Sequence, residues 1–159
     1  APELPATTLA EQCYLSMFYR CTSLVTAPAL PATTLTNTCY KSMFSSCTSL
    51  TKAPELPATT LTEQCYCEMF RECESLVTAP ELPATTLAKQ CYDHMFYNCK
   101  KLNYIKMLAT DISATDCLYY WVYRVSSTGV FVKNVNMTSL SSSEYTGIPS
   151  GWTVQNAVS

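Results

Sequence analysis

A repeat of 26 residues constrains the fold of this chain more than any other feature of its sequence. The first copy begins at Ala1 with A-P-E-L-P-A-T-T-L, and further copies begin at Ala27, Ala53 and Ala79 without insertion or deletion. A fifth, degenerate copy begins near Ile105. A fixed period of this length is typical of a solenoid, in which each copy forms one turn and packs only against its neighbours.

Each copy is predicted to contain one helix and one short strand. In the first copy, apolar residues recur every four positions from Leu9 to Cys21. This spacing favours a helix of about three turns over Leu9–Tyr19. A short parallel strand is predicted over Leu24–Ala27, because the prolines that follow cannot donate to a sheet ladder. Strands pack at about 4.8 Å and helices at about twice that distance, so we expect an arc with strands inside and helices outside.

The ten cysteines would ordinarily suggest a disulfide scaffold, but the repeat favours a different interpretation. Nine of them fall in two columns of the repeat, and Val125 takes the fifth place in the second column. A column that accepts valine requires a small apolar filler, which a buried free thiol also is. We therefore predict buried free thiols, with disulfides and a metal site as the alternatives. The two columns are Cys13, Cys39, Cys65, Cys91 and Cys117, and Cys21, Cys47, Cys73 and Cys99.

Cys67 is the one cysteine outside these columns. The other copies place residues of unrelated chemistry at its position, which indicates a surface site. Cys67 is therefore predicted to be an exposed thiol. Its counterparts are Leu15, Lys41, Asp93 and Tyr119.

Two further columns are aromatic. A row of exposed aromatic rings could bind sugars, but stacked rings at a fixed column more often fill the core between turns. We predict core positions for both rows. They are Tyr14, Tyr40, Tyr66 and Tyr92, and Phe18, Phe44, Phe70 and Phe96.

The tail changes character after Val125, where serine, threonine, asparagine and glycine become frequent. Strands are predicted at residues 129–132 and 152–154, with a turn at 147–151 between them. A β-hairpin here would cover the open edge of the last copy and act as a C-terminal cap. We therefore divide the chain into a repeat array at 1–125, with four regular copies and one degenerate copy, and a β cap at 126–159.

Composition and residue content argue against several classes of function. The ten Lys and Arg residues against twelve Asp and Glu, with a net charge of −2, make no basic stripe for nucleic acid. No apolar run reaches the length of a membrane span. The only histidine is His94, and on a helix Asp93 would point away from it, so no catalytic triad is expected. A pair of Cys67 and His94 on adjacent copies is the alternative, but two ligands do not make a zinc site. We expect no enzyme activity, no cofactor and no metal.

The repeat also resembles a known family. The pattern M-F-x-x-C-x-x-L, as in Met17 to Leu24, and the turn L-P-A-T-T-L resemble the BspA-like leucine-rich repeats of the Treponema pallidum type, common in Bacteroides surface proteins. The ending T-G-x-F-x-K…G-I-P-S-G-W-T-V is similar to the C-terminal cap of that group. The resemblance implies an α/β right-handed leucine-rich-repeat solenoid, with short parallel strands inside, helices outside and a C-terminal β-hairpin cap. It also implies a bacterial cell-surface or secreted protein, often with adhesive roles.

The expected function is a non-catalytic interaction or adhesion module, and the alternative is a structural spacer that displays another domain. The expected partner is a host or bacterial surface protein or a glycan, and the expected location is extracellular or on the bacterial surface, with the anchor outside this chain. Because the chain starts inside a repeat without a cap, we expect it to be a piece of a longer protein. Candidate binding residues on the strand face are Val25, Thr26, Lys52, Thr78, Asn103 and Tyr104. A second variable patch, on the expected outer helix face, comprises Tyr19, Arg20, Arg71, Glu72, Tyr97, Asn98, Tyr123 and Arg124.

Overall fold

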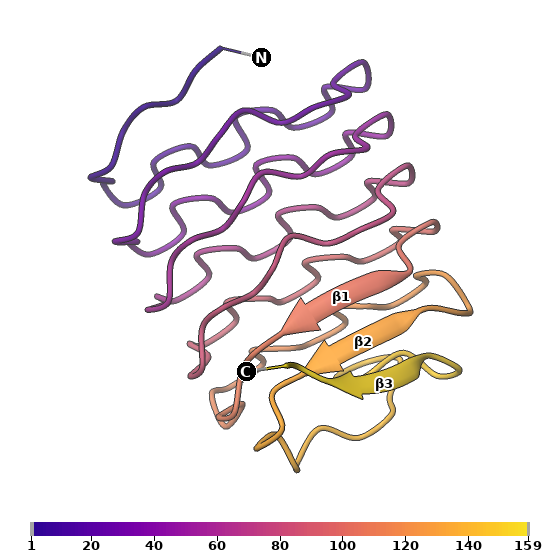
Figure 1. Cartoon of the computed structure of the whole chain (residues 1–159). Coiled ribbons are helices and arrows are strands. Elements are labelled where there is room, and N and C mark those ends of the chain that lie inside the picture. The colour runs from indigo at the N-terminus through magenta and orange to yellow at the C-terminus, as the bar shows by residue number, and fades with distance from the viewer. Residues whose placement is uncertain (1, 159) are drawn as a thin grey trace.

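The repeat forms a stack of coils with two layers, one extended and one made of turns. The computed structural model describes residues 2–158. Figure 1 shows each copy as one coil lying on the next, with extended segments in front and undulating segments behind. We call these the extended layer and the turn layer.

The strands of the described residues lie at the C-terminal end of the extended layer. They are β1 at Tyr104–Met107, β2 at Val130–Lys133 and β3 at Thr153–Asn156, and they form a three-stranded parallel sheet in the order β1-β2-β3. In the extended layer of the regular copies, neighbouring coils are joined by isolated bridges and not by a continuous ladder, as between Thr26 and Lys52. Each regular copy has two prolines in this segment, and proline cannot donate to a ladder, whereas β1 has none. β1 overlaps the column predicted for a strand, which is 102–105 in this copy, but lies two residues later. Among the described residues, the copies that carry the prolines form no strand in that column.

The predicted helices are absent from the described part of the chain. In the turn layer every fourth residue has a left-handed backbone, with φ of 57° at Thr38, 54° at Ser42 and 60° at Ser46. An α-helix requires φ near −63° throughout and bonds from residue i to i−4. Here, alternate N–H groups bond three residues back, as from Met43 to the carbonyl of Tyr40 at 3.2 Å. The segment is therefore a chain of turns with a period of four residues.

The remaining N–H groups of the turn layer hold the coils together. The N–H of Ser42 donates to the carbonyl of Cys67 in the next coil at 2.8 Å, and that of Phe44 donates to Met69 at 3.0 Å. The same direction recurs between all successive coils of the array, as in Phe70 to Met95 and Phe96 to Trp121. A helix would have used these N–H groups internally, so the turn conformation exchanges local bonds for bonds between coils.

Ring spacing in the core also excludes helices in this layer. Phe44 stacks on Phe18 at 5.4 Å and on Phe70 at 5.7 Å between ring centroids, with interplanar angles of 4° and 8°. Packed helices require axes about 8–10 Å apart. The expected arc rested on a mismatch between strand and helix spacing, and this reason for curvature disappears once both layers are joined by backbone bonds.

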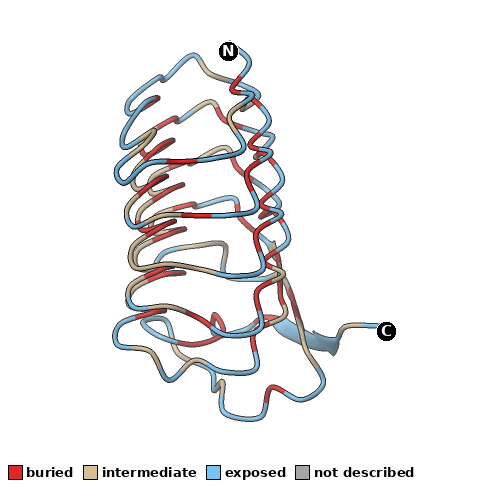
Figure 2. Ribbon diagram, turned by 90° about the vertical axis from the view of Figure 1, so that its left-hand side faces the viewer, coloured by how far each residue is buried: buried red, intermediate tan, exposed pale blue. Residues whose placement is uncertain are grey.

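The core lies between the two layers, as the buried residues on the inner side of the coils show (Figure 2). In the turn layer two residues point inward and the next two outward, so Cys39 and Tyr40 are buried and Lys41 and Ser42 are half-buried. The predicted core positions of the tyrosine and phenylalanine rows are confirmed, although Tyr14 of the first coil is only partly covered.

Both cysteine columns are buried beyond the first coil, as expected, while Cys13 is half-buried and Cys21 exposed. The second column also has a polar role. The thiol of Cys47 donates to the carbonyl of Phe18 at 3.1 Å, and the equivalent bonds from Cys73 and Cys99 measure 3.2 Å and 3.0 Å. A small apolar side chain that carries a weak donor suits this position between coils.

The tail continues the stack and does not form a hairpin. β2 and β3 are parallel, so the predicted β-hairpin cap is wrong, although both predicted strands exist within a residue or two. The return segment between them contributes its own inter-coil bonds: the indole of Trp121 donates to Gly147 at 2.9 Å, and that of Trp152 donates to Ser126 at 2.7 Å, both 26 residues apart. Together with the missing helices, this shows that the expected fold class, a right-handed α/β leucine-rich-repeat solenoid, is wrong.

Candidate functional site

The six candidate residues predicted on the strand face lie on the outer side of the extended layer. Bridges join Thr26 to Lys52 and Thr78 to Tyr104, which places members of the set side by side on neighbouring coils. Five of the six are exposed, and Tyr104 is half-buried in β1. They line none of the hollows described below. The face comprises Val25, Thr26, Lys52, Thr78, Asn103 and Tyr104.

The turn layer carries the more structured surface, which we call the turn face. It consists of the outward pairs of the four-residue turn pattern, repeated in every coil. The second variable patch predicted from the sequence falls on this face, on turns where a helix was expected. Coil stacking brings its members into contact across copies, as where Tyr97 lies 5.4 Å from Tyr123 between ring centroids.

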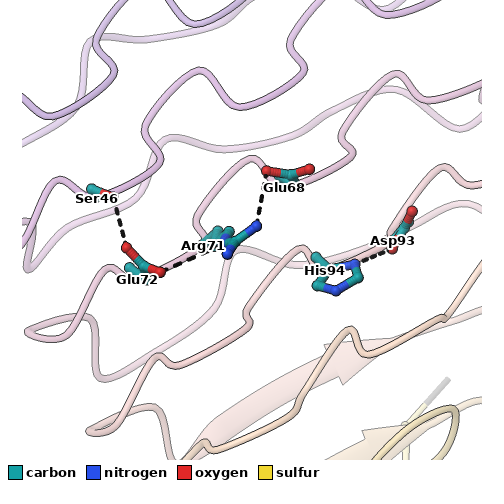
Figure 3. Close-up of polar contacts among 6 residues, drawn as sticks. All are labelled: Ser46, Glu68, Arg71, Glu72, Asp93 and His94. Atoms are coloured by element: carbon teal, nitrogen blue, oxygen red, sulfur yellow. Dashed lines mark hydrogen bonds and ion pairs between the residues drawn. The ribbon is translucent and has the colours of Figure 1, made fainter.

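A polar network occupies the middle of the turn face. The hydroxyl of Ser46 donates to the carboxylate of Glu72 at 2.9 Å, and Arg71 lies 3.5 Å from both Glu68 and Glu72 (Figure 3). A hollow of about 220 Å³ adjoins this network. Arg71 is thereby held in one orientation with part of its guanidinium still facing solvent. The hollow is lined by Tyr19, Arg20, Ser45, Ser46, Glu68, Arg71 and Glu72.

Tyrosines crowd the part of the turn face nearest the C-terminal end of the stack. Tyr120 is the central ring, with edge-to-face contacts to Tyr119 at 4.5 Å and Tyr145 at 5.1 Å. Tyr145 in turn stacks on Tyr123 at 5.8 Å. Tyr119 is 43% exposed and Tyr145 is 48% exposed. We define the tyrosine cluster as Tyr97, Tyr119, Tyr120, Tyr123 and Tyr145.

Arginines lie over rings of this surface. The guanidinium of Arg71 lies 5.1 Å from the centroid of Tyr97, and that of Arg124 lies 5.3 Å from the centroid of Tyr123. Such contacts are attractive by about 0.5–1 kcal/mol at exposed sites. The cluster therefore joins apolar rings, hydroxyl groups and positive charge on one pre-packed surface.

His94 lies at the edge of the cluster and contacts Asp93, contrary to the expectation from a helix. Its Nδ1 contacts the Asp93 carboxylate, because the left-handed backbone at His94, with φ of 51°, turns the two neighbouring side chains together (Figure 3). The face of the imidazole stacks on Tyr120, with 5.4 Å between ring centroids. Burial raises the pKa of Asp93, and the hydrogen bond from His94 opposes that rise.

Cys67, predicted to be the exposed thiol, is buried with 2% of its surface accessible, and the exposed cysteine is Cys21. Its column does face outward, but Cys67 is short and lies between the longer side chains of Lys41 and Asp93 on the neighbouring coils. Burial raises the pKa of Cys67 to about 12, with Asp93 adding to the rise. A buried, protonated thiol is a poor nucleophile, so the alternative of a Cys67–His94 pair gains no support.

No group of three or more metal-ligating side chains occurs within residues 2–158. No helix in that range is long and apolar enough to cross a membrane. Comparison with protein-family models, with curated proteins and with solved structures finds no match. The resemblance to BspA-like repeats therefore stays a prediction, and the helical fold that it implied is not the fold observed.

Comparison of the repeat copies with one another predicts part of the turn face and misses the rest. Variation between copies predicts Tyr97 and Tyr123 as surface residues, because their column differs from one copy to the next. Tyr119 and Tyr120 replace Asp93 and His94 of the preceding copy, and this clustering of tyrosines in the degenerate copy was the available signal. Tyr145 lies outside the repeat, so no column comparison could place it.

Proposed function

We propose that this protein is a non-catalytic interaction module that binds its partner through the turn face. The observation that carries the proposal is the tyrosine cluster, in which the exposed rings of Tyr119 and Tyr145 pack with half-buried rings of the fourth and fifth coils beside two arginines. Tyrosine and arginine are, with tryptophan, the residue types enriched among those that dominate binding energy at interfaces.

The arrangement favours binding because the rings are already ordered. Tyr120 contacts three other tyrosines of the cluster, and Arg71 is held by two carboxylates. Ordering a flexible side chain on binding costs about 0.5–1.5 kcal/mol, and side chains that are packed in the free protein avoid much of that cost. Exposed apolar clusters rimmed by polar groups are also a general mark of interaction surfaces.

The proposed partner is a host or bacterial surface protein or a glycan, and the proposed location is extracellular or at the bacterial surface. Both follow from the resemblance of the repeat motif to BspA-like proteins. Tyrosine rings and hydroxyls suit either partner, since they offer flat apolar area and hydrogen bonds together. The non-catalytic part of the proposal is supported by the burial of Cys67.

The test is a binding screen with matched variants. The chain would be passed over immobilised fibronectin, laminin and type IV collagen and over a glycan array. Tyr119→Ala and Tyr145→Ala should each weaken any interaction about tenfold, as expected for an anchor residue. Both residues are exposed, so circular dichroism should show an unchanged fold. Thr26→Ala and Thr78→Ala on the extended layer are the controls and should bind normally.

Two outcomes would contradict the proposal. If Thr78→Ala weakened binding and Tyr145→Ala did not, the binding face would be the extended layer. If the folded chain bound nothing on the whole panel, the spacer function would be favoured instead.

A further inference from the structure

A proline-lined groove on the extended layer lies outside the turn face. It runs between the P-E-L-P segments of the third and fourth coils and has a volume of about 500 Å³. A smaller groove of about 250 Å³ occupies the same columns between the first two coils. The larger groove is lined by Ala53, Pro54, Glu55, Leu56, Pro57, Pro80, Glu81 and Pro83.

The groove exists because the sequence removes backbone bonds at this level of the stack. Two of every four residues in P-E-L-P are prolines, which have no N–H to donate. Among the described residues, no backbone hydrogen bond links 53–57 with 80–83. One coil further on, where a lysine replaces the first proline, Leu82 donates to Lys106 at 3.0 Å and Leu108 donates to Leu82 at 3.0 Å. Backbone hydrogen bonds therefore join the fourth and fifth coils at this level, whereas the third and fourth coils remain separated by the groove.

The two carboxylates that line the groove differ in whether a cation neutralises them. The carboxylate of Glu81 accepts a hydrogen bond from the Lys106 ammonium at 3.0 Å, and Lys106 lies 25 residues further along. The residue that stands in the same relation to Glu55 is Pro80, which has no charge. Within residues 2–158, Glu55 forms no ion pair or side-chain hydrogen bond. The fifth coil thus supplies to Glu81 a cation that the fourth coil cannot supply to Glu55.

We propose that this groove binds a lysine or arginine side chain of a partner protein, with the cationic head on Glu55 and the aliphatic stem along the proline rings. Basic side chains have apolar stems and charged ends, and they bury the stem while the head stays near water. The Lys106–Glu81 pair shows that this column of the fold accommodates such a contact. The site is independent of the turn face, so failure of one proposal leaves the other standing.

The test uses nuclear magnetic resonance of the ¹⁵N-labelled chain titrated with the peptide Ac-Ala-Ala-Arg-Ala-Ala-NH₂. Shifts should be confined to the amides of Ala53, Glu55, Leu56, Glu81 and Leu82 and their neighbours. The same peptide with citrulline in place of arginine should bind more weakly, because citrulline keeps the shape and removes the charge. Glu55→Gln should reduce affinity about fivefold, the upper end expected for one exposed ion pair. Glu11→Gln, which removes an exposed carboxylate of the first coil, is the control and should leave affinity unchanged.

Lys106→Ala provides a test in the opposite direction. It should free Glu81 for the ligand and raise the affinity of the groove for the arginine peptide severalfold. Equal binding of the citrulline peptide, full affinity in Glu55→Gln, or shifts that map to another surface would each overturn the proposal. A fall in affinity in Lys106→Ala would equally contradict it, since the groove would then lose rather than gain an acceptor.

Discussion

Glycine substitutions can distinguish the observed turns from the helix that the periodicity favours. The two conformations predict changes of opposite sign in the free energy of unfolding when Ser42 is replaced by glycine. Its φ of 54° is left-handed, which costs an L-residue about 1–2 kcal/mol relative to the right-handed region. Glycine removes that cost but loses about 0.5–1 kcal/mol through greater freedom of the unfolded chain. Ser42→Gly should therefore raise the free energy of unfolding by about 0.5 kcal/mol. In a helix the same change would lower it.

Ser45 provides a matched control three residues away. It undergoes the same chemical change, but its φ is not positive and the residue is buried, with 3% of its surface accessible. Ser45→Gly should lower the free energy of unfolding by about 1 kcal/mol through backbone freedom and lost packing. Urea unfolding followed by the fluorescence of the two buried tryptophans, Trp121 and Trp152, would measure both variants. Equal destabilisation by the two substitutions would refute the turn assignment.

Three further predictions concern the core. Phe70→Ala removes a fully buried ring stacked on both sides and should cost about 3–5 kcal/mol, whereas Phe18→Ala, with a ring neighbour on one side, should cost clearly less; urea midpoints would show this, and equal costs would contradict the stacked core. Iodoacetamide followed by peptide mass spectrometry should label Cys21 in the folded chain and Cys67 only after unfolding, and rapid labelling of Cys67 would show its burial to be wrong. Burial raises the pKa of Cys47 to about 11 and of Cys67 to about 12, above the value of the unfolded chain, so this contribution to stability should be complete at neutral pH and lost as pH rises through 9 to 12; a urea midpoint that stayed constant up to pH 11 would contradict it.

The sequence predicted the core columns well because burial depends on side-chain spacing. Cys39, Met43 and Cys47 recur every four residues, and all three are fully buried. The same spacing failed to identify the backbone, since a helix and a chain of four-residue turns both place residues i and i+4 on one side. A helix of 3.6 residues per turn drifts by about 40° for every four residues, so a strict period of four in every copy was evidence against it.

The backbone conformation of the turn layer and the pairing of the strands depend on hydrogen bonds between residues far apart in the sequence. Whether the N–H of Ser42 bonds within its own segment or to Cys67 depends on how closely the coils stack, which a single copy cannot reveal. In the tail, the pairing of β3 likewise cannot be read from its own residues. The residues predict a strand at 152–154, close to the observed β3, but its parallel pairing with β2 depends on the path of the segment between them.

Among the candidate site residues, too, some can be predicted from the sequence and others cannot. Tyr97 was found by comparing copies, because surface positions vary while the core repeats. Cys67 was misplaced by that reasoning, because a varied column can still hide a short side chain between longer neighbours. The P-E-L-P motif is visible in the sequence, but the difference between Glu55 and Glu81 depends on the ion pair between Glu81 and Lys106, which the sequence does not reveal.

The inter-coil bonds of the turn layer have an electrostatic consequence for the whole stack. From Ser42 to Cys67, from Phe70 to Met95 and from Phe96 to Trp121, each N–H points toward the C-terminal end and each carbonyl toward the N-terminal end. Peptide dipoles aligned in this way add together, as they do along a helix axis. The turn layer therefore has a positive pole at the fifth coil, which carries Tyr119, Tyr120 and Tyr123, and a negative pole at the first coil. Each added repeat would lengthen this dipole without changing its direction.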